Sequence, residues 1–243
     1  MGTSLAESVY YSLRNKILRG EMRPGSALLE EDLSDTLQVS RTPLRKALTQ
    51  LTSEGYLEKG KDRTLRIPKI SKEALKDTLF TRKLLEVAAS EQAALFASAE
   101  DISRIEHLVW EEEEALKIRD SLMISSVDRM FHNYIAKTSS NRVLEEFIGQ
   151  IGYKISLYLA LSNTLGDIIE EAIKEHKKIL NGIKLKMPDR AASAMQEHLN
   201  NVERRIFESI RSEERDAPIA KHVTEKKKRK KNITRGGTDG DKS

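Results

Sequence analysis

The sequence predicts a mainly α-helical protein of two domains: a small N-terminal domain of three helices and a β-hairpin, followed by an all-α antiparallel bundle. Three observations support this fold class. Charged residues make up 33% of the 243 residues and aromatic residues only 5%, and the abundant Leu, Ala, Glu and Lys favour helices. Apolar residues recur at helical spacing from residue 72 to about residue 211. Two short segments near residues 56 and 67 are instead typical of strands.

The first two helices follow from the spacing of their apolar residues. Leu5 to Arg19 has apolar residues at steps of four, which indicates an amphipathic helix, and Arg23-Pro24-Gly25 forms a turn after it. A second, short helix is expected over about residues 29–37. Only a few residues around Gln38-Val39 then separate it from a third helix over residues 41–54. The two helices must therefore cross closely, as in a helix-turn-helix.

The third helix combines a buried stripe with a pair of exposed arginines. Ser40 is expected to be its N-cap, with the side-chain hydroxyl accepting a free backbone N–H of the first turn. Apolar residues follow at the spacing of a core-facing stripe, namely Leu44, Ala47, Leu48 and Leu51. This spacing leaves Arg41 and Arg45, one turn apart, on the outer face.

Two arginines near the start of a helix can bind phosphate, or can bind guanine O6 and N7 bidentately in a major groove. Taken alone, such a pair is more often a solvated helix face. The flanking residues change this interpretation. Tyr56 to Glu58 and Thr64 to Ile67 are expected to pair as strands, joined by a cationic turn that contains Lys61 and Arg63. Three helices and a basic hairpin predict a winged helix-turn-helix, a DNA-binding domain, over residues 1–70.

Most of this domain matches a known pattern. The segment Val39-Ser40-Arg41-Thr42-Pro43-Leu44-Arg45 and its surroundings over residues 9–57 resemble the DNA-binding domain of the GntR family of bacterial transcription regulators. The resemblance implies that four residues contact operator phosphates and bases: Ser40, Arg41, Thr42 and Arg45. It also implies that the wing reaches into the minor groove, through Lys61 and Arg63.

Residues 71–212 are predicted to form a second, all-α domain of six helices. Apolar stripes mark these helices near residues 75–89, 102–116, 122–138, 141–162, 166–185 and 189–211. Pro188 with Asp189 marks a turn between the last two. After residue 212 the apolar periodicity ends, and residues 213–243 carry ten Lys and Arg against six Asp and Glu. This composition predicts a basic, disordered tail.

Four side chains of the second domain have the spacing of a metal site. Asp128 and His132 project from one face of a helix, where a carboxylate and an imidazole can reach a common ion. His176 and His198 lie 12 residues before and 10 residues after Pro188. In an antiparallel hairpin that rises about 1.5 Å per residue, they fall within roughly 3 Å of one level. A solvated side chain is the usual explanation for one such histidine, but the set favours a metal site.

The motifs Asp128-x-x-x-His132, Glu175-His176 and Glu197-His198 resemble the metal-binding form of the FCD ligand domain, which occurs in the FadR-like branch of GntR regulators. The resemblance implies an antiparallel bundle of six or seven helices with a metal in a central cavity. Three imidazoles and one carboxylate suit the divalent ions Zn(II), Ni(II), Mn(II) or Fe(II). Such a site can also accept the carboxylate of a small organic acid, which would make the metal part of an effector site.

Two further residues match the family pattern near this pocket. Arg82 is a candidate to grip the carboxylate of the acid bidentately. Its spacing from Glu86 is also typical of a surface ion pair within one helix. Asn141 opens the following helix, where a capping role explains it equally well. Arg82 and Asn141 are therefore the candidate effector-binding residues.

These features together predict a transcription regulator, taken as a repressor, whose operator affinity is controlled by a small organic acid at a metal site. A single DNA-binding module makes few contacts, so a homodimer on a near-palindromic operator is expected. The same regulator with a purely structural or metal-sensing site stays open as an alternative. A metallohydrolase with Glu175 or Glu197 as base is a remote alternative, because it leaves the first seventy residues unexplained. No enzyme activity is therefore predicted.

Composition limits the remaining possibilities. The absence of cysteine excludes disulfides and thiolate metal sites. No segment has the pattern of a signal peptide or a membrane-spanning helix, so a cytoplasmic protein without a membrane partner is expected. Residues 1–70 carry 12 Lys and Arg against 9 Asp and Glu, a small excess that is consistent with a double-stranded DNA partner.

Overall fold

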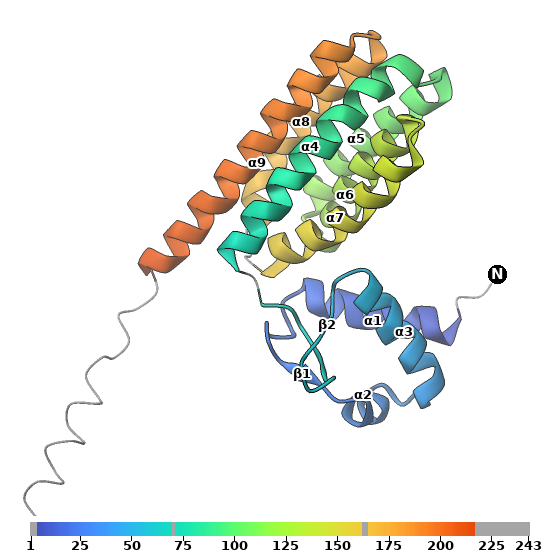
Figure 1. Ribbon diagram of the computed structural model, residues 1–243, viewed down its shortest axis with the longest axis vertical. Helices are drawn as coiled ribbons and strands as arrows, with labels where there is room; N and C mark the ends of the chain where they lie inside the picture. The colour runs from blue at the N-terminus through green and yellow to red at the C-terminus, as the bar shows by residue number, and fades with distance from the viewer. Residues whose placement is uncertain (1–3, 70, 162–164, 217–243) are drawn as a thin grey trace, which may run out of the picture.

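The computed structural model describes residues 4–69, 71–161 and 165–216. In Figure 1 the N-terminal domain, coloured blue to cyan, lies beside one end of a long helical bundle coloured green to orange. Only a short segment joins them, since the last strand of the first domain ends at Arg66 and the first bundle helix begins at Lys72. The mainly α-helical, two-part fold predicted from the sequence is therefore present.

α1 (Leu5–Leu18) opens the N-terminal domain with a capping box. The Ser4 side chain accepts the N–H of Glu7, and the Glu7 carboxylate accepts the N–H of Ser4 at 2.7 Å. The inner face of α1 packs on α3 (Arg41–Ser53) around one apolar core. Its fully buried members include Leu13, Ile17, Leu44, Leu48, Leu51 and Ile67.

α2 (Glu30–Leu37) and α3 form the helix-turn-helix. Gln38 between them adopts the left-handed conformation with φ 53°, and the N–H of Val39 donates to the Ser34 carbonyl at 3.1 Å. α3 begins at Arg41 as predicted. Ser40 occupies the N-cap position, but its side chain makes no capping hydrogen bond, so the predicted use of its hydroxyl is wrong. The start of α3 is exposed, and water can satisfy the free N–H groups there.

The wing is a small antiparallel sheet of three short strands in the order β1-β3-β2. These strands are β1 (Ala27–Leu28), β2 (Glu58–Lys59) and β3 (Leu65–Arg66). The turn between β2 and β3 closes as the Gly60 N–H donates to the Thr64 carbonyl at 2.9 Å, with Arg63 at φ 63°. The hairpin was predicted, whereas β1 was not, because two residues are too few to show a period.

Six helices of the described chain form the bundle. They are α4 (Lys72–Phe96), α5 (Ala99–Ile118), α6 (Ser121–Thr138), α7 (Arg142–Leu161), α8 (Leu165–Lys184) and α9 (Pro188–Asp216). Short connections join the helices (Figure 1); α5 packs on α6, α6 on α7 and α8 on α9, while α4 packs on α7 and α9. Side-chain oxygens of Ser98 and Asp120 cap α5 and α6. Gly182 permits the close approach of α8 and α9, since a Cβ there would lie 2.7 Å from the Ala191 backbone.

The C-terminal end differs slightly from the prediction. α9 continues to Asp216, four residues beyond the predicted end of the domain at residue 212. The rest of the predicted basic tail, residues 217–243, lies outside the described residues. Among the helices that the structure describes, none combines the length and the apolar character needed to span a lipid bilayer.

The two domains meet where α7 passes the N-terminal domain. Leu157 of α7 is buried in the N-terminal core, and Tyr153 and Leu122 pack against that core. Tyr56 is fully buried just after α3, and its ring contacts Tyr153 edge to face, with 5.8 Å between ring centroids. This apolar contact joins the N-terminal domain to α7 of the bundle.

Candidate functional site

The outer face of α3 brings together the predicted DNA-contacting side chains. Arg41, Thr42 and Arg45 are exposed on this helix, and Ser40 is exposed at its start. Arg45 Nε donates to Oε2 of Glu30, the first residue of α2, at 2.8 Å. The Arg45 side chain nevertheless remains 63% exposed. α3 therefore presents two guanidinium groups one turn apart to the solvent.

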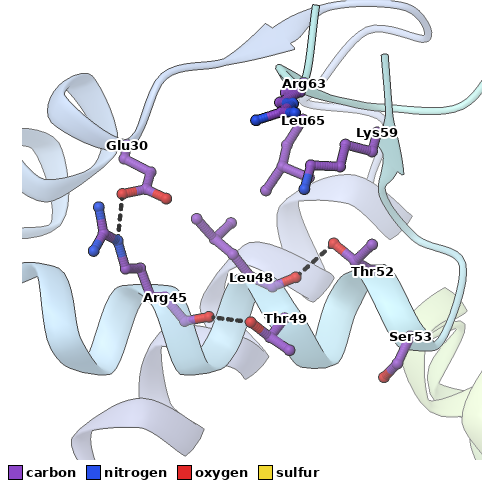
Figure 2. Close-up of a pocket in the computed structure, with 9 residues that line it drawn as sticks. All are labelled: Glu30, Arg45, Leu48, Thr49, Thr52, Ser53, Lys59, Arg63 and Leu65. Carbon is purple, nitrogen blue, oxygen red and sulfur yellow. Dashed lines mark hydrogen bonds and ion pairs between the residues drawn. The ribbon is translucent and has the colours of Figure 1, made fainter. Parts of the chain in front are cut away.

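An open groove of about 630 Å³ lies between α3 and the wing (Figure 2). Its described lining residues are Glu30, Arg45, Leu48, Thr49, Thr52, Ser53, Lys59, Arg63 and Leu65. Lys59 and Arg63 belong to the wing side of the groove, and Arg45 and Thr49 to the helix side. Lys61 is exposed in the wing turn but does not line the groove. Lys59, which was not predicted as a DNA contact, lines the groove.

Three histidines from three helices meet in the core of the bundle. His132 lies on α6, His176 on α8 and His198 on α9, and each is at most 4% exposed. The Nε2 atoms of His176 and His198 are 3.4 Å apart, and one ligand atom from each of the three lies within 4.8 Å of the others. Asp128 Oδ1 is 3.9 Å from the Nε2 atoms of both His132 and His176. The structure thus brings the four predicted ligands together.

A buried glutamate stands behind each histidine. The Nδ1 to Oε2 distances are 2.5 Å for His132 with Glu86, 2.9 Å for His176 with Glu112 and 2.9 Å for His198 with Glu175. Glu112 and Glu175 each accept the Nδ1 proton of their histidine, which fixes the ring and leaves the Nε2 lone pair free. Glu86 and His132 are in close contact, but these two atoms lack hydrogen-bond geometry. The Nε2 atoms of His176 and His198 face each other, and this donor set fits a divalent metal ion.

Burial and neighbouring charges shift the pKa values of these groups in different directions: those of His198 and Glu86 are lowered, and that of His176 is raised. Burial, together with the neighbouring His176 and His132, lowers the pKa of His198 well below its usual value, so this imidazole is neutral. Burial raises the pKa of Glu86, but the adjacent Arg82 guanidinium and His132 ring outweigh this effect and hold the pKa at about 2. His132 Nε2 has no hydrogen-bond partner among the described residues. Its lone pair is thus available to a cation.

The two candidate effector residues lie in different surroundings. Arg82 is buried on α4, and its Nε donates to Glu86 Oε1 at 2.6 Å. The surface alternative for this pair is wrong, because both side chains are at most 4% exposed. Asn141 Oδ1 accepts the backbone N–H groups of Val143 and Leu144 at the start of α7. Asn141 lines a separate surface pocket with residues from the end of α4.

Comparison with known proteins accounts for both domains. Residues 5–65 match the model of the bacterial regulatory proteins of the gntR family, and residues 77–201 match the FCD domain. The Uxu operon regulator of Haemophilus influenzae is 30% identical to this chain, and the match covers 81% of the chain and 79% of that protein. The chain belongs to the GntR family. This GntR protein is therefore a transcription regulator with a DNA-binding GntR domain and an FCD ligand domain.

Further comparisons agree with this assignment. The Uxu operon transcriptional regulator of Escherichia coli (strain K12) is 29% identical over 81% of this GntR chain and 84% of that protein. The solved structure of E. coli McbR/YncC has the same fold, with a TM-score of 0.71 and 23% identity, covering 86% of this chain and 100% of that one. The predicted metal ligands all fall within the FCD match and the predicted α3 contacts within the GntR match.

The relatives of this GntR protein are transcription regulators and not enzymes, which sets the metallohydrolase alternative aside. The two carboxylates that were considered as general bases also have other hydrogen-bond or ion-pair partners. Glu175 accepts from His198 and, at 2.8 Å, from Asn201 Nδ2. Glu197 is exposed and pairs with Lys178 at 3.0 Å. Neither is placed to activate a water beside the histidines.

Glu86 and Glu112 were not predicted from the sequence as partners of the histidines. A signal was present, because each carboxylate falls on the apolar stripe of its helix. Glu112 follows Ile105 and Leu108 at helical spacing, and both of these are buried in the core. Charged residues are almost never fully buried without a partner. A glutamate on such a stripe of an FCD domain is therefore a candidate second layer around a metal site.

Proposed function

We propose that this GntR regulator binds its operator through α3 and the wing, and that a small organic acid bound at a metal ion in the FCD domain controls operator affinity. One observation carries the proposal. Imidazole nitrogens of three helices converge with Asp128 in the bundle core, and a buried glutamate carboxylate lies next to the Nδ1 atom of each histidine. Burying so many polar and charged groups costs free energy. A bound cation would offset that cost.

The proposed metal ligands are His132, His176, His198 and Asp128. This set suits Zn(II), Ni(II), Mn(II) or Fe(II). When bound, such an ion supplies a Lewis-acid centre that can take a carboxylate oxygen of an acid. Arg82 is the proposed second anchor for the acid, because it is close enough to interact electrostatically with Asp128. Asn141 is left out of this role, since its side-chain oxygen already caps α7.

A structural or metal-sensing site is the second candidate. It is favoured by one observation: Arg82 Nε already donates to Glu86 in the core. Part of the Arg82 guanidinium therefore has a hydrogen-bond partner before any acid binds. In this case the metal alone, without an acid, would set operator affinity. Both candidates share the same metal ligands and the same DNA-binding surface.

We also propose that the protein acts in the cytoplasm as a homodimeric repressor on a near-palindromic operator. Exposed apolar side chains on two packed helices support the dimer: Phe80 and Leu84 on α4, and Val143 and Phe147 on α7, each at least 50% exposed. Exposed apolar surface of this kind marks protein interfaces. Two copies would present two α3 helices to half-sites about one DNA turn apart. Repression is the action that the family resemblance implies.

The proposal is tested on a duplex that the protein itself selects from a randomised library. We expect a near-palindromic sequence that binds two copies of the chain. A divalent metal added with a panel of small organic acids should change the affinity for this duplex by about 5- to 150-fold, the usual range for coupled sites. A response to the metal that no acid modifies would favour the metal-sensing site. Failure to select any sequence would contradict the DNA-binding proposal.

The route from the metal site to α3 is short in the proposed mechanism. Arg129 follows the ligand Asp128 on α6, and its guanidinium carbon lies 4.6 Å from the centre of the Tyr153 ring. Tyr153 contacts Tyr56, which lies just after α3, and Arg14 of α1 donates to the Tyr56 hydroxyl at 3.4 Å. A movement of α6 that accompanies ligand binding would therefore reach the DNA-binding domain through a cation–π contact and an aromatic pair.

Replacing Tyr153 by leucine is expected to uncouple the two sites. Leucine keeps apolar bulk at the domain interface but removes the ring that joins Arg129 to Tyr56. Operator binding without ligands should persist, while the ligand-dependent change should fall to about threefold or less, below the range of coupled sites. Tyr134→Leu is the matched control, since Tyr134 also faces a cation, Lys137, but within the bundle. Equal coupling in Tyr153→Leu and wild type would exclude this route.

A further inference from the structure

We infer that Glu30 is a positioning residue that aims Arg45 at a base edge and thereby sets operator specificity. The inference rests on the proposed DNA-binding role of α3. Glu30 is the first residue of α2, and Arg45 lies one turn after the start of α3. Their contact therefore crosses the helix-turn-helix. Figure 2 shows the Glu30 carboxylate beside the Arg45 guanidinium at the margin of the groove.

The contact uses one nitrogen of the guanidinium and leaves the others available. Arg45 Nε donates to Glu30 Oε2 at 2.8 Å. The two Nη groups form the far end of the fork, and among the described residues they have no hydrogen-bond partner. A guanidinium binds O6 and N7 of guanine through two of its N–H groups. Glu30 thus binds the Nε side of the Arg45 guanidinium, and the two Nη groups stay available for a base.

The Glu30–Arg45 pair restrains the Arg45 side chain but adds little to the free energy of unfolding. The two side chains are 63% and 39% exposed, and exposed ion pairs contribute little to folding. An unrestrained arginine loses the freedom of its rotatable bonds when it binds. Glu30 already restrains the Arg45 guanidinium in the free protein. Arg45 therefore loses less conformational entropy when it binds a base in the orientation that Glu30 permits. This increase in affinity applies to an operator with a base in the matching position and not to other sequences.

Glu30 also places a negative charge on a surface that otherwise suits DNA. Among the described residues that line the groove it is the one acidic side chain, together with the cations Arg45, Lys59 and Arg63. A carboxylate in this position weakens the attraction to phosphates for every sequence. Glu30 therefore lowers nonspecific affinity and supports the specific contact. Both effects raise the ratio of operator to nonspecific affinity, which is the quantity that matters in a genome.

The test measures this ratio for variants of the full chain. The probes are the duplex selected by the wild-type protein and a shuffled duplex of the same length. Glu30→Ala removes both the charge and the contact, whereas Glu30→Gln removes the charge but keeps an oxygen that can accept from Arg45 Nε. Glu31→Ala is the matched control. Glu31 is the next acidic residue in the first turn of α2, so this variant loses the same helix-terminal charge and leaves the contact in place.

We expect Glu30→Ala to lower the operator-to-shuffled ratio by about tenfold, because each of the two copies in the dimer keeps its Arg45 base contact in a weakened form. Glu30→Gln should restore most of that ratio, and Glu31→Ala should keep it. Adding Arg45→Ala to Glu30→Ala should cost no more than Arg45→Ala alone. A ratio that is equal in Glu30→Ala and Glu31→Ala, while Arg45→Ala lowers it, would overturn the inference and leave the role of α3 intact. An unchanged ratio in Arg45→Ala would overturn both.

Discussion

Replacing Arg45 by alanine is expected to lower operator affinity by about 100-fold, because a symmetric dimer loses two base contacts of about 1.4 kcal/mol each. The Arg45 side chain is 63% exposed, and that of its partner Glu30 is 39% exposed. The substitution should therefore leave the free energy of unfolding nearly unchanged. A gel-shift titration on the selected duplex measures the affinity, and thermal unfolding of the same samples verifies the fold.

Arg190→Ala is the matched control for this prediction. Arg190 is exposed in the first turn of α9, in the FCD domain, and its loss changes the net charge by the same amount. Its operator affinity should equal that of the wild type. Equal losses on operator and shuffled duplexes in Arg45→Ala would make Arg45 a phosphate contact. Full operator affinity in Arg45→Ala would instead contradict the assignment of α3 as the helix that reads DNA.

Much of the N-terminal domain could be predicted because its signals are local. The start of α3 at Arg41 and the burial of Leu44 and Leu51 follow from spacings within a few residues. Two details could not be predicted in this way. The Ser40 hydroxyl makes no capping bond, and β1 consists of two residues that pair with β3. Both details depend on solvent or on a distant segment, which a local pattern does not describe.

In the bundle, the histidines and Asp128 could be predicted as one cluster, but the glutamates that contact the histidines could not. The proximity of His176 and His198 follows from counting residues around the turn at Pro188, and their Nε2 atoms are 3.4 Å apart. The pairing of Glu112 with His176 joins residues 64 positions apart on α5 and α8. Packing between these two helices sets their register. That register decides which of the consecutive glutamates 111–114 contacts an imidazole. The register could not be predicted from local sequence patterns.

Replacing His176 by alanine is expected to abolish metal binding. His176 is fully buried, and its Nε2 is close to both His198 and Asp128. The substitution also leaves Glu112 without its imidazole partner. A metal at about 100 times its dissociation constant stabilises a protein by about 2.7 kcal/mol, and we expect the variant to gain almost none of this. Thermal unfolding with and without Zn(II), together with elemental analysis of the purified protein, measures both quantities.

Two comparisons separate the loss of a ligand from general damage to the core. His107 is 51% exposed and stacks on Trp110, so His107→Ala should keep the metal and its stabilising effect. Asp128→Asn keeps the size of a side chain that is 18% exposed, so it should fold normally and still bind less metal, because an amide is a weaker ligand than a carboxylate. If Asp128→Asn and His176→Ala both retain full metal content, the cluster is not a metal centre, and its glutamates serve only to satisfy buried imidazoles.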